Sequence, residues 1–310
     1  MNKNALTVEN LTKIYFGDKK NQTEVKALNN ISFDVKQGEI FGLLGPNGAG
    51  KTTFLSILAG TSIKTSGLVN VWGFNLDINP RQVKASIGIV PQEVNLDAFF
   101  SPKSLLELQA GLYGVTKNNR ITDTILKMVS LEKKANSYSR SLSGGMKRRL
   151  LIAKAMVHQP PILILDEPTA GVDVELRKNL WENVRELNKE GVTIILTTHY
   201  LFEAQEMCDR IAIINKGNLV ALDTTQKLLD KVKTKKITIK IDNFDSNINL
   251  NLKGVEFKIN KDSTISVSYE KNSNKFNELL NILKEKNLKI LDISTDDGNL
   301  EDVFVQLTKS

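Results

Sequence analysis

The first two thirds of the chain alternate short apolar runs with helical stretches. The apolar runs lie at residues 38–44, 162–165 and 192–197, and helical stretches lie at 52–59 and 174–189. Continuous runs of Ile, Leu and Val that are followed by helices are typical of strands covered on both faces by crossover connections. Residues 6–222 are therefore predicted to form an α/β domain with a mainly parallel core sheet.

Two departures from this pattern divide the chain further. Between about residues 94 and 140 the β-type runs stop, and Leu105, Leu108 and Leu112 recur at helical spacing, which predicts an inserted helical subdomain. Later strands are predicted at 236–241, 255–259, 263–269 and 289–293, and helices at 276–285 and 301–307. We therefore expect one domain over residues 1–226 and a small C-terminal α+β domain over residues 227–310.

Composition excludes several classes of protein. A chain of 310 residues with 41% apolar residues can bury a full core, which excludes a disordered chain. No apolar run approaches the roughly 18 to 20 residues of a membrane-spanning helix, and the N-terminus has no apolar signal core. Cys208, expected to fill the core, has no second cysteine to pair with. These features predict a reducing, cytoplasmic setting.

The net charge of +7 comes from 42 basic and 35 acidic residues. Because lysine is spread along the chain together with many Asn and Ile residues, we favour a general composition bias over an anionic partner as the explanation. The exception is the stretch at 227–240, where six lysines accompany one acid. An anionic lipid surface is one possible partner for it.

The strongest local signal is the sequence GPNGAGKT at residues 45–52, between a predicted strand and a predicted helix. It fits the pattern G-x-x-x-x-G-K-S/T, in which backbone N–H groups surround phosphate oxygens, the lysine reaches the β and γ phosphates and the hydroxyl contacts Mg²⁺. The predicted nucleotide-binding residues of this segment are Gly45, Pro46, Asn47, Gly48, Ala49, Gly50, Lys51, Thr52 and Thr53.

Two acidic residues end the apolar run at 162–165. Asp166 would hold a Mg²⁺ ion, and Glu167 could polarise the attacking water. The other interpretation is a solvated strand edge. The apolar run directs both acids to the sheet end that carries the phosphate-binding loop, which favours the functional interpretation.

Ser143, Gly144 and Gly145 open a helix predicted to extend to about Val157. A helix start with these residues offers unpaired N–H groups to an anion, although a serine there is usually only an N-cap. The basic residues that follow, Lys147, Arg148 and Arg149, are expected to form a solvated helix face. His158 is expected to be a helix-end residue without a functional role.

Over residues 5–225 the chain resembles the ATP-binding cassette (ABC) ATPases. The order of motifs in that family is matched by Tyr15, the loop at 45–52, Gln92, Ser143, Asp166 with Glu167, the segment at 170–173, and His199. The resemblance implies a P-loop NTPase fold of the ABC type, with a mainly parallel core sheet, an antiparallel β part and an inserted helical subdomain. It also implies ATP and Mg²⁺ as cofactors.

The resemblance also implies individual roles. Tyr15 would stack on adenine, with Phe16 as the alternative and a place in the ordinary core as the other interpretation. Glu167, His199 and Gln92 form the implied catalytic set, and Gln92 joins Thr52 and Asp166 as an implied Mg²⁺ ligand. Ser143, Gly144 and Gly145 would close over ATP on a second copy in a head-to-tail, ATP-dependent homodimer.

Two departures from the family pattern point to one branch of it. Met146 replaces the usual final Gln of the Ser143 motif, and residues 170–173 read Ala-Gly-Val-Asp. Both variants, and the C-terminal residues 299–308, are similar to the branch that serves drug, antibiotic and polysaccharide exporters with a separately encoded permease. The resemblance therefore implies an ATPase on the cytoplasmic face of the cell membrane, with the helical insert docking a permease helix and no nucleic-acid partner. The alternative is a soluble member of the family that acts on nucleic acid or ribosomes.

Overall fold

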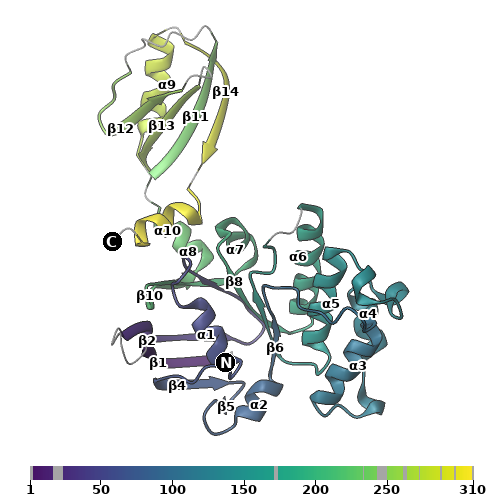
Figure 1. Cartoon of the computed structure of the whole chain (residues 1–310). Coiled ribbons are helices and arrows are strands. Elements are labelled where there is room, and N and C mark those ends of the chain that lie inside the picture. Colours follow the sequence, from purple (N-terminus) through teal and green to yellow (C-terminus); the bar gives the residue numbers. More distant parts are fainter. Residues whose placement is uncertain are drawn as a thin grey trace. The chain divides into compact units, whose positions relative to one another are not determined.

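The computed structural model describes residues 3–16, 24–170, 174–232, 234–242, 250–260, 264–271, 273–286, 288–296 and 298–308. The chain divides into two compact units, Met1–Thr224 and Thr225–Ser310 (Figure 1). This division lies two residues before the boundary expected from the sequence. Within the described ranges, no helix combines the length and the apolar character needed to cross a membrane.

A six-stranded sheet forms the centre of the first unit, in the strand order β10-β9-β3-β8-β7-β6. Its strands are β3 (Ile40–Leu44), β6 (Ile87–Val90), β7 (Ile162–Asp166), β8 (Thr193–Thr198), β9 (Arg210–Asn215) and β10 (Asn218–Thr224). All neighbouring strands are parallel except β10, which is antiparallel to β9. Every residue of β3 and β8 is buried, as expected for strands covered on both faces. The predicted mainly parallel core sheet is confirmed.

A second sheet of the first unit is antiparallel, in the order β2-β1-β4-β5. Its strands are β1 (Asn4–Phe16), β2 (Glu24–Lys36), β4 (Ser66–Val71) and β5 (Phe74–Asn75). Helix α1 (Lys51–Leu58) joins the two sheets through an aromatic cluster. Phe54 of α1 lies 5.4 Å from Phe33 of β2, which in turn stacks on Phe41 of β3 at 5.6 Å between ring centroids. This packing fixes the position of the helix that follows the phosphate-binding loop.

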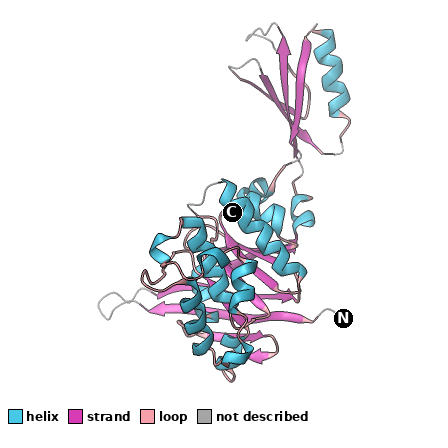
Figure 2. Ribbon diagram, turned by 90° about the vertical axis from the view of Figure 1, so that its right-hand side faces the viewer, coloured by secondary structure: helices cyan, strands magenta, loops and turns pink. Residues whose placement is uncertain are grey.

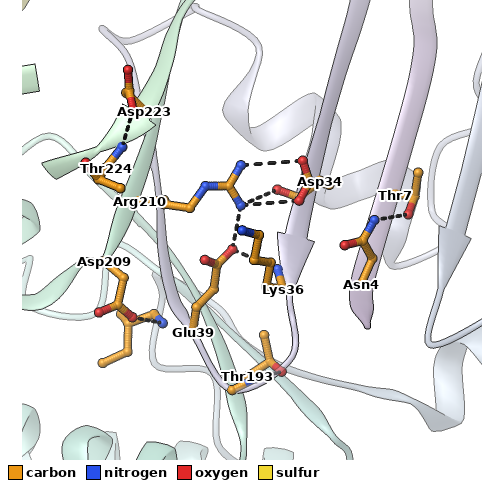
Figure 3. A network of polar contacts seen from close by, with 12 residues as sticks. Asn4, Thr7, Asp34, Lys36, Glu39, Thr193, Asp209, Arg210, Asp223 and Thr224 are labelled. Carbon is orange, nitrogen blue, oxygen red and sulfur yellow. Dashed lines mark hydrogen bonds and ion pairs between the residues drawn. The ribbon is translucent and has the colours of Figure 1, made fainter. Parts of the chain in front are cut away.

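A partly buried arginine, Arg210, also links the two sheets, as Figure 3 shows. The Arg210 guanidinium at the start of β9 lies 3.0 Å from Glu39 and 3.3 Å from Asp34 of β2. Glu39 accepts a further hydrogen bond from the backbone N–H of Lys36 at 2.8 Å. Burial raises the pKa of Glu39, and the two hydrogen bonds counter that effect. The antiparallel sheet is thereby held to the start of β9.

Helices make up the stretch between β6 and β7, and residues 91–161, all described, contain no strand. The helices are α3 (Pro102–Leu112), α4 (Thr122–Met128) and α5 (Gly144–Met156), with single turns of 3-10 helix at Lys117–Asn119, Glu132–Lys134 and Ser139–Ser141. The first unit also contains α2 (Pro80–Ala85), α6 (Val174–Lys189) and α7 (Leu201–Met207). The inserted helical part is confirmed, although the strand-free stretch extends beyond residue 140 because α5 follows directly.

The second unit is a four-stranded antiparallel sheet with helices, in the strand order β12-β13-β11-β14. Its elements are α8 (Thr225–Leu229), β11 (Thr234–Asp242), β12 (Val255–Ile259), β13 (Thr264–Glu270), α9 (Lys275–Glu285), β14 (Lys289–Asp296) and α10 (Leu300–Thr308). Figure 2 shows α9 against one face of the sheet, where Leu279 and Leu283 pack on buried residues of β11 and β13. In the lysine-rich stretch, Lys236 forms an ion pair with Asp302 at 2.8 Å, and Lys240 lies opposite Asp292 on the neighbouring strand. Acidic residues of α10 and β14 therefore lie near two of these lysines.

Candidate functional site

Residues 45–50 of the phosphate-binding segment predicted at 45–52 connect β3 to α1. Gly48 and Gly50 have φ angles of 78° and 113°, in the region that glycine adopts without a steric penalty. A Cβ on Gly45 would lie 2.3 Å from a backbone carbonyl oxygen of β9, and one on Gly50 would lie 2.5 Å from one of β2. Glycine therefore lets the loop lie against both strands and lead into the N-terminus of α1, whose N–H groups suit a phosphate.

Lys51, the first residue of α1, is 6% exposed. Its Nζ donates a hydrogen bond to the carbonyl oxygen of Gly45 at 2.6 Å and lies 3.3 Å from that of Pro46. Burial lowers the pKa of Lys51, and the carboxylates of Glu167 and Asp166 offset part of that effect. A cation is thus held against the loop in a partly dehydrated site, where its attraction to an anion is stronger than in water.

Three strand ends bring the predicted catalytic residues together. Glu167 follows β7, His199 follows β8, and Gln92 follows β6 by two residues. The Nδ1 of His199 lies 3.0 Å from Oε2 of Glu167, and the Nε2 of Gln92 donates to the same oxygen at 3.2 Å. The Glu167 side chain is 11% exposed, whereas that of His199 is 44% exposed. The carboxylate is therefore oriented by two neighbours and shielded from most of the solvent.

Thr197 of β8 holds both Asp166 and Glu167 in place. The Thr197 hydroxyl donates to Oδ1 of Asp166 at 2.5 Å, and the Glu167 N–H donates to the Thr197 carbonyl oxygen at 3.0 Å. Glu167 itself has a φ of 43°, a left-handed conformation that is costly for a residue with a Cβ. The conformation turns the chain sharply at the end of β7, and the surrounding contacts must maintain it.

A cavity of about 740 Å³ contains most of the predicted residues, a volume typical of ligand pockets. The predicted site residues in its walls are Pro46, Asn47, Gly48, Ala49, Gly50, Lys51, Thr52, Thr53, Gln92, Asp166, Glu167 and His199. Sequence reasoning missed four further wall residues: Val25, Lys26, Ala27 and Lys216. They belong to β2 and to the turn between β9 and β10, where no local pattern distinguishes them from other strand and turn residues.

Tyr15 does not line this cavity. It is 41% exposed, and its cross-strand partner in β2 is Val25, which does line the cavity. Lys13 lies over the Tyr15 ring at 4.6 Å, and the Tyr15 hydroxyl is 3.4 Å from that of Ser62. Phe16 is 70% exposed. Both candidates for adenine stacking are therefore at the surface rather than in the core, and only Tyr15 pairs with a residue of the cavity wall.

The predicted anion site at Ser143 is also separate from this cavity. Ser143 is the N-cap of α5 and its hydroxyl accepts from the N–H of Met146 at 3.3 Å. Ser143 and Gly144 are exposed and Gly145 is buried. None of the three belongs to the cavity walls that the described residues form. Of the motif at 170–173, residues 171–173 lie outside the described part of the chain.

The expectation of a solvated basic face on α5 is wrong for Arg148. Arg148 is 4% exposed, and its guanidinium donates to backbone carbonyl oxygens in the loops that follow β6 and β7. Arg149 is partly buried and donates to the carbonyl oxygen of Val129 at 2.9 Å. The expectation failed because α5 is enclosed on several sides, so a polar residue in it does not have to face solvent.

A second cavity, of about 380 Å³, lies between β6 and the helical region. His158, expected to be an ordinary helix-end residue, lines it and stacks on Tyr113 with ring centroids 3.7 Å apart. Its Nε2–H donates to the carbonyl oxygen of Ile87 at 3.1 Å. Burial lowers the pKa of His158. The His158 ring therefore connects the end of α3 to β6.

Cys208 is buried, as expected, and burial raises the pKa of its thiol.

Comparisons with known proteins show which family the chain is similar to. A profile of the ABC transporter family matches residues 28–170. The linearmycin resistance ATP-binding protein LnrL of Bacillus subtilis is 40% identical over 229 residues, which cover 73% of this chain and 71% of the relative. Nod factor export ATP-binding protein I of Rhizobium sp. is 39% identical over 233 residues, which cover 74% of each chain.

Solved structures show the same similarity. The ATP-binding subunit of an ABC transporter matches with a TM-score of 0.64 and 28% identity, covering 73% of this chain and 92% of that one. A dimeric ATP-binding cassette in a post-hydrolysis state, bound to ADP and Pi, matches with a TM-score of 0.61 and 26% identity. That match covers 71% of this chain and 98% of the other.

Proposed function

The chain belongs to the ABC transporter family, and on that premise we propose that it is the ATP-hydrolysing subunit of an exporter whose permease is a separate chain. Membership of the family makes it an ATP-binding protein and an ATPase. One relative is named for Nod factor export and another for linearmycin resistance. These names support an exporter. We assign the ATPase domain to residues 1–226 and an accessory domain to residues 227–310.

The observation that carries the proposal is the convergence of Glu167, His199 and Gln92 in one cavity with Lys51. Transfer of a phosphoryl group to water depends on positioning and on neutralisation of charge more than on covalent chemistry. We assign Lys51 to the β and γ phosphates. Glu167 accepts the proton of the attacking water, and His199 holds the carboxylate and contacts the γ-phosphate.

The residues of the cavity also fit a Mg²⁺ ion. Thr52 and Asp166 lie in its walls, and hydroxyl and carboxylate oxygens are ligands that Mg²⁺ prefers. Gln92 uses its Nε2 for the bond to Glu167, so its amide oxygen is the ligand atom we assign. When bound, Mg²⁺ supplies positive charge that neutralises the phosphates of ATP. The loop from Gly45 to Gly50 and Thr53 completes the site for the nucleotide.

We assign Ser143, Gly144 and Gly145 to ATP on a second copy of the chain, in a head-to-tail dimer. The N-terminus of α5 is suited to a phosphate, and Ser143 and Gly144 are exposed outside the walls of their own cavity. A solved relative is a dimer bound to ADP and Pi, which supports dimerisation here. Tyr15 is assigned to the adenine because it neighbours the cavity wall at Val25.

The second cavity and the adjoining face of α3 support a permease as the membrane partner. Ile89 and Leu151 line the cavity, and Leu112 on α3 is 74% exposed. An apolar groove beside an exposed apolar residue suits an amphipathic helix. We therefore propose that a permease helix docks here and places the ATPase on the cytoplasmic face of the cell membrane, with no nucleic-acid partner.

Two experiments test the proposal. Lys51→Ala should abolish Mg²⁺-dependent ATP hydrolysis by the purified protein, while the matched change Lys103→Ala, at an exposed lysine in an ion pair on α3, should retain it. Hydrolysis by Lys51→Ala equal to that of the wild type would refute the assigned site.

Leu112→Asp should keep hydrolysis in solution but lose co-purification of an integral membrane protein. Co-purification of ribosomes or nucleic acid instead would favour the soluble alternative.

A further inference from the structure

The buried guanidinium of Arg148 joins the two loops that carry the predicted catalytic residues. Its Nη1 donates to the carbonyl oxygens of Pro91 at 2.9 Å and Gln92 at 2.8 Å. Its Nε donates to the carbonyl oxygen of Pro168 at 2.8 Å, and its Nη2 to that of Glu167 at 2.9 Å. One side chain of α5 thus holds the loop after β6 and the loop after β7 at the same time.

These contacts require an arginine. The guanidinium is a planar fork with five N–H donors, and it donates to four carbonyl oxygens from two separate loops. Burial lowers the pKa of Arg148, and the charge of Asp166 counters that effect. A lysine carries the same charge at a single point and cannot reach both loops with fixed directions.

Arg148 binds the backbone of Gln92 and Glu167, and the side chains of these two residues contact each other. Gln92 and Glu167 each offer a carbonyl oxygen to Arg148, and their side chains are joined at 3.2 Å in the ATP cavity. Glu167 has the left-handed φ of 43°, which needs support from its surroundings. The hydrogen bond to its carbonyl oxygen is such support, because a relaxed backbone would turn that oxygen away from Nη2.

We propose that Arg148 is a positioning residue that sets the Glu167 carboxylate against the Gln92 amide for attack of water on ATP. Arg148 lies in the helix that begins at Ser143, so it also connects the residues proposed to contact ATP on the second copy to the base that acts in its own cavity. The inference rests on the proposed function, since it assumes that Glu167 is the base. Arg148 itself does not line the ATP cavity.

The test compares Arg148→Lys and Arg148→Ala with Arg149→Ala in the full chain. Arg149 also donates from a guanidinium on α5 to a carbonyl oxygen, but that of Val129 in the helical region, so it controls for loss of an arginine from this helix. We expect kcat to fall by about 10- to 100-fold in both Arg148 variants, since a displaced catalytic group costs that much. The KM for ATP should stay within about twofold, because Lys51 and Thr52 are unchanged.

Chemical rescue separates positioning from general stability. Methylguanidinium at a sub-denaturing concentration should raise the kcat of Arg148→Ala and leave that of Arg149→Ala unchanged, since it fits the space that the missing side chain leaves. A kcat of Arg148→Lys equal to that of Arg149→Ala, a raised KM with unchanged kcat, or no rescue would overturn the inference. Loss of the melting transition in both variants overturns it too, because a residue that only positions two loops leaves the sheets folded.

Glu167→Gln, measured beside these variants, distinguishes the two failures. If Glu167→Gln hydrolyses ATP normally, the proposed function of Glu167 is wrong. If Glu167→Gln is inactive while Arg148→Lys is fully active, the role of Glu167 stands and only the inference about Arg148 fails.

Discussion

Replacing Glu167 with Gln separates the binding of ATP from its hydrolysis. The change keeps the size of the side chain and one oxygen that can face His199, which lies 3.0 Å from the carboxylate. It removes the ability to accept a proton from water. Lys51, Thr52 and Asp166 are untouched, so the groups proposed to hold ATP remain in the cavity.

The expected fall in kcat follows from the contribution of a general base and from the hydrogen bond that the Glu167 carboxylate accepts from Gln92. A general base contributes roughly 10²- to 10⁴-fold to the rate, which is about 2.7 to 5.4 kcal/mol. The Gln92 amide donates to Oε2 at 3.2 Å, and rotating the new amide to keep that bond costs at most about 1 kcal/mol. We therefore expect kcat to fall at least 100-fold, by about 2.7 kcal/mol or more, with the affinity for ATP within about twofold.

The assay measures phosphate release and the mass of the particle in the same sample. If the closed dimer opens after hydrolysis, its lifetime should rise by the same factor by which kcat falls, and ATP with Mg²⁺ should shift the variant from monomer to dimer in light scattering. Adding Ser143→Arg should prevent the shift, because it places a bulky cation where the phosphate of the second copy must fit. Ser143 is exposed, so this change leaves the core of its own subunit intact.

Three results would refute this reasoning. Hydrolysis by Glu167→Gln within about threefold of the wild type would exclude Glu167 as the base. A variant that binds ATP but stays monomeric at saturation, with the permease absent and again with it present, would exclude the composite site. A dimer that forms equally well with Ser143→Arg would also exclude it.

Two further predictions concern the units and the second cavity. A chain ending at Thr224 should fold and bind a fluorescent ATP analogue with an affinity within about twofold of the full chain, because the cavity residues and their core all lie in the first unit; an insoluble product would refute this. Burial lowers the pKa of His158 from its usual 6.5, so its contribution to stability is complete above that pH and is lost as the pH falls further. His158→Phe keeps the stacking on Tyr113, so its melting temperature should fall less than that of the wild type between about pH 7.5 and 5.5; parallel curves would contradict this.

The parts of the fold that could be predicted from the sequence depend on local chemistry. The loop at 45–50 requires glycine because neighbouring backbone lies 2.3 to 2.5 Å from where a Cβ would be, so the motif is visible in the sequence itself. The acids at Asp166 and Glu167 are visible for a similar reason, since buried strands end where polar residues begin. The alternation of residues in β11 predicts a strand of the sheet in the second unit in the same way, because every second residue faces the core.

Other residues could not be found because their partners are distant in the sequence. His158 looked like a helix-end residue, yet its ring packs on Tyr113, which is 45 positions earlier in the chain. Lys216 reaches the cavity that contains Lys51 and Glu167 from a turn after β9, at a position that only the order of strands in the sheet determines. Helical periodicity also failed for α5, because buried residues occur on more than one of its faces.

Arg148 shows why positioning residues are harder to recognise than catalytic ones. The role proposed for Glu167 requires a carboxylate at a strand end, so the residue type itself indicates that role. Arg148 instead binds the carbonyl oxygens of Gln92 and Glu167, and every residue has a carbonyl oxygen, so its partners carry no pattern in the sequence. A charged residue in a helix is assigned to solvent by default, and only its 4% exposure contradicts that assignment. A buried guanidinium that binds only backbone therefore marks a place where the fold must hold loops in one conformation, and here those loops carry the proposed base and its neighbour.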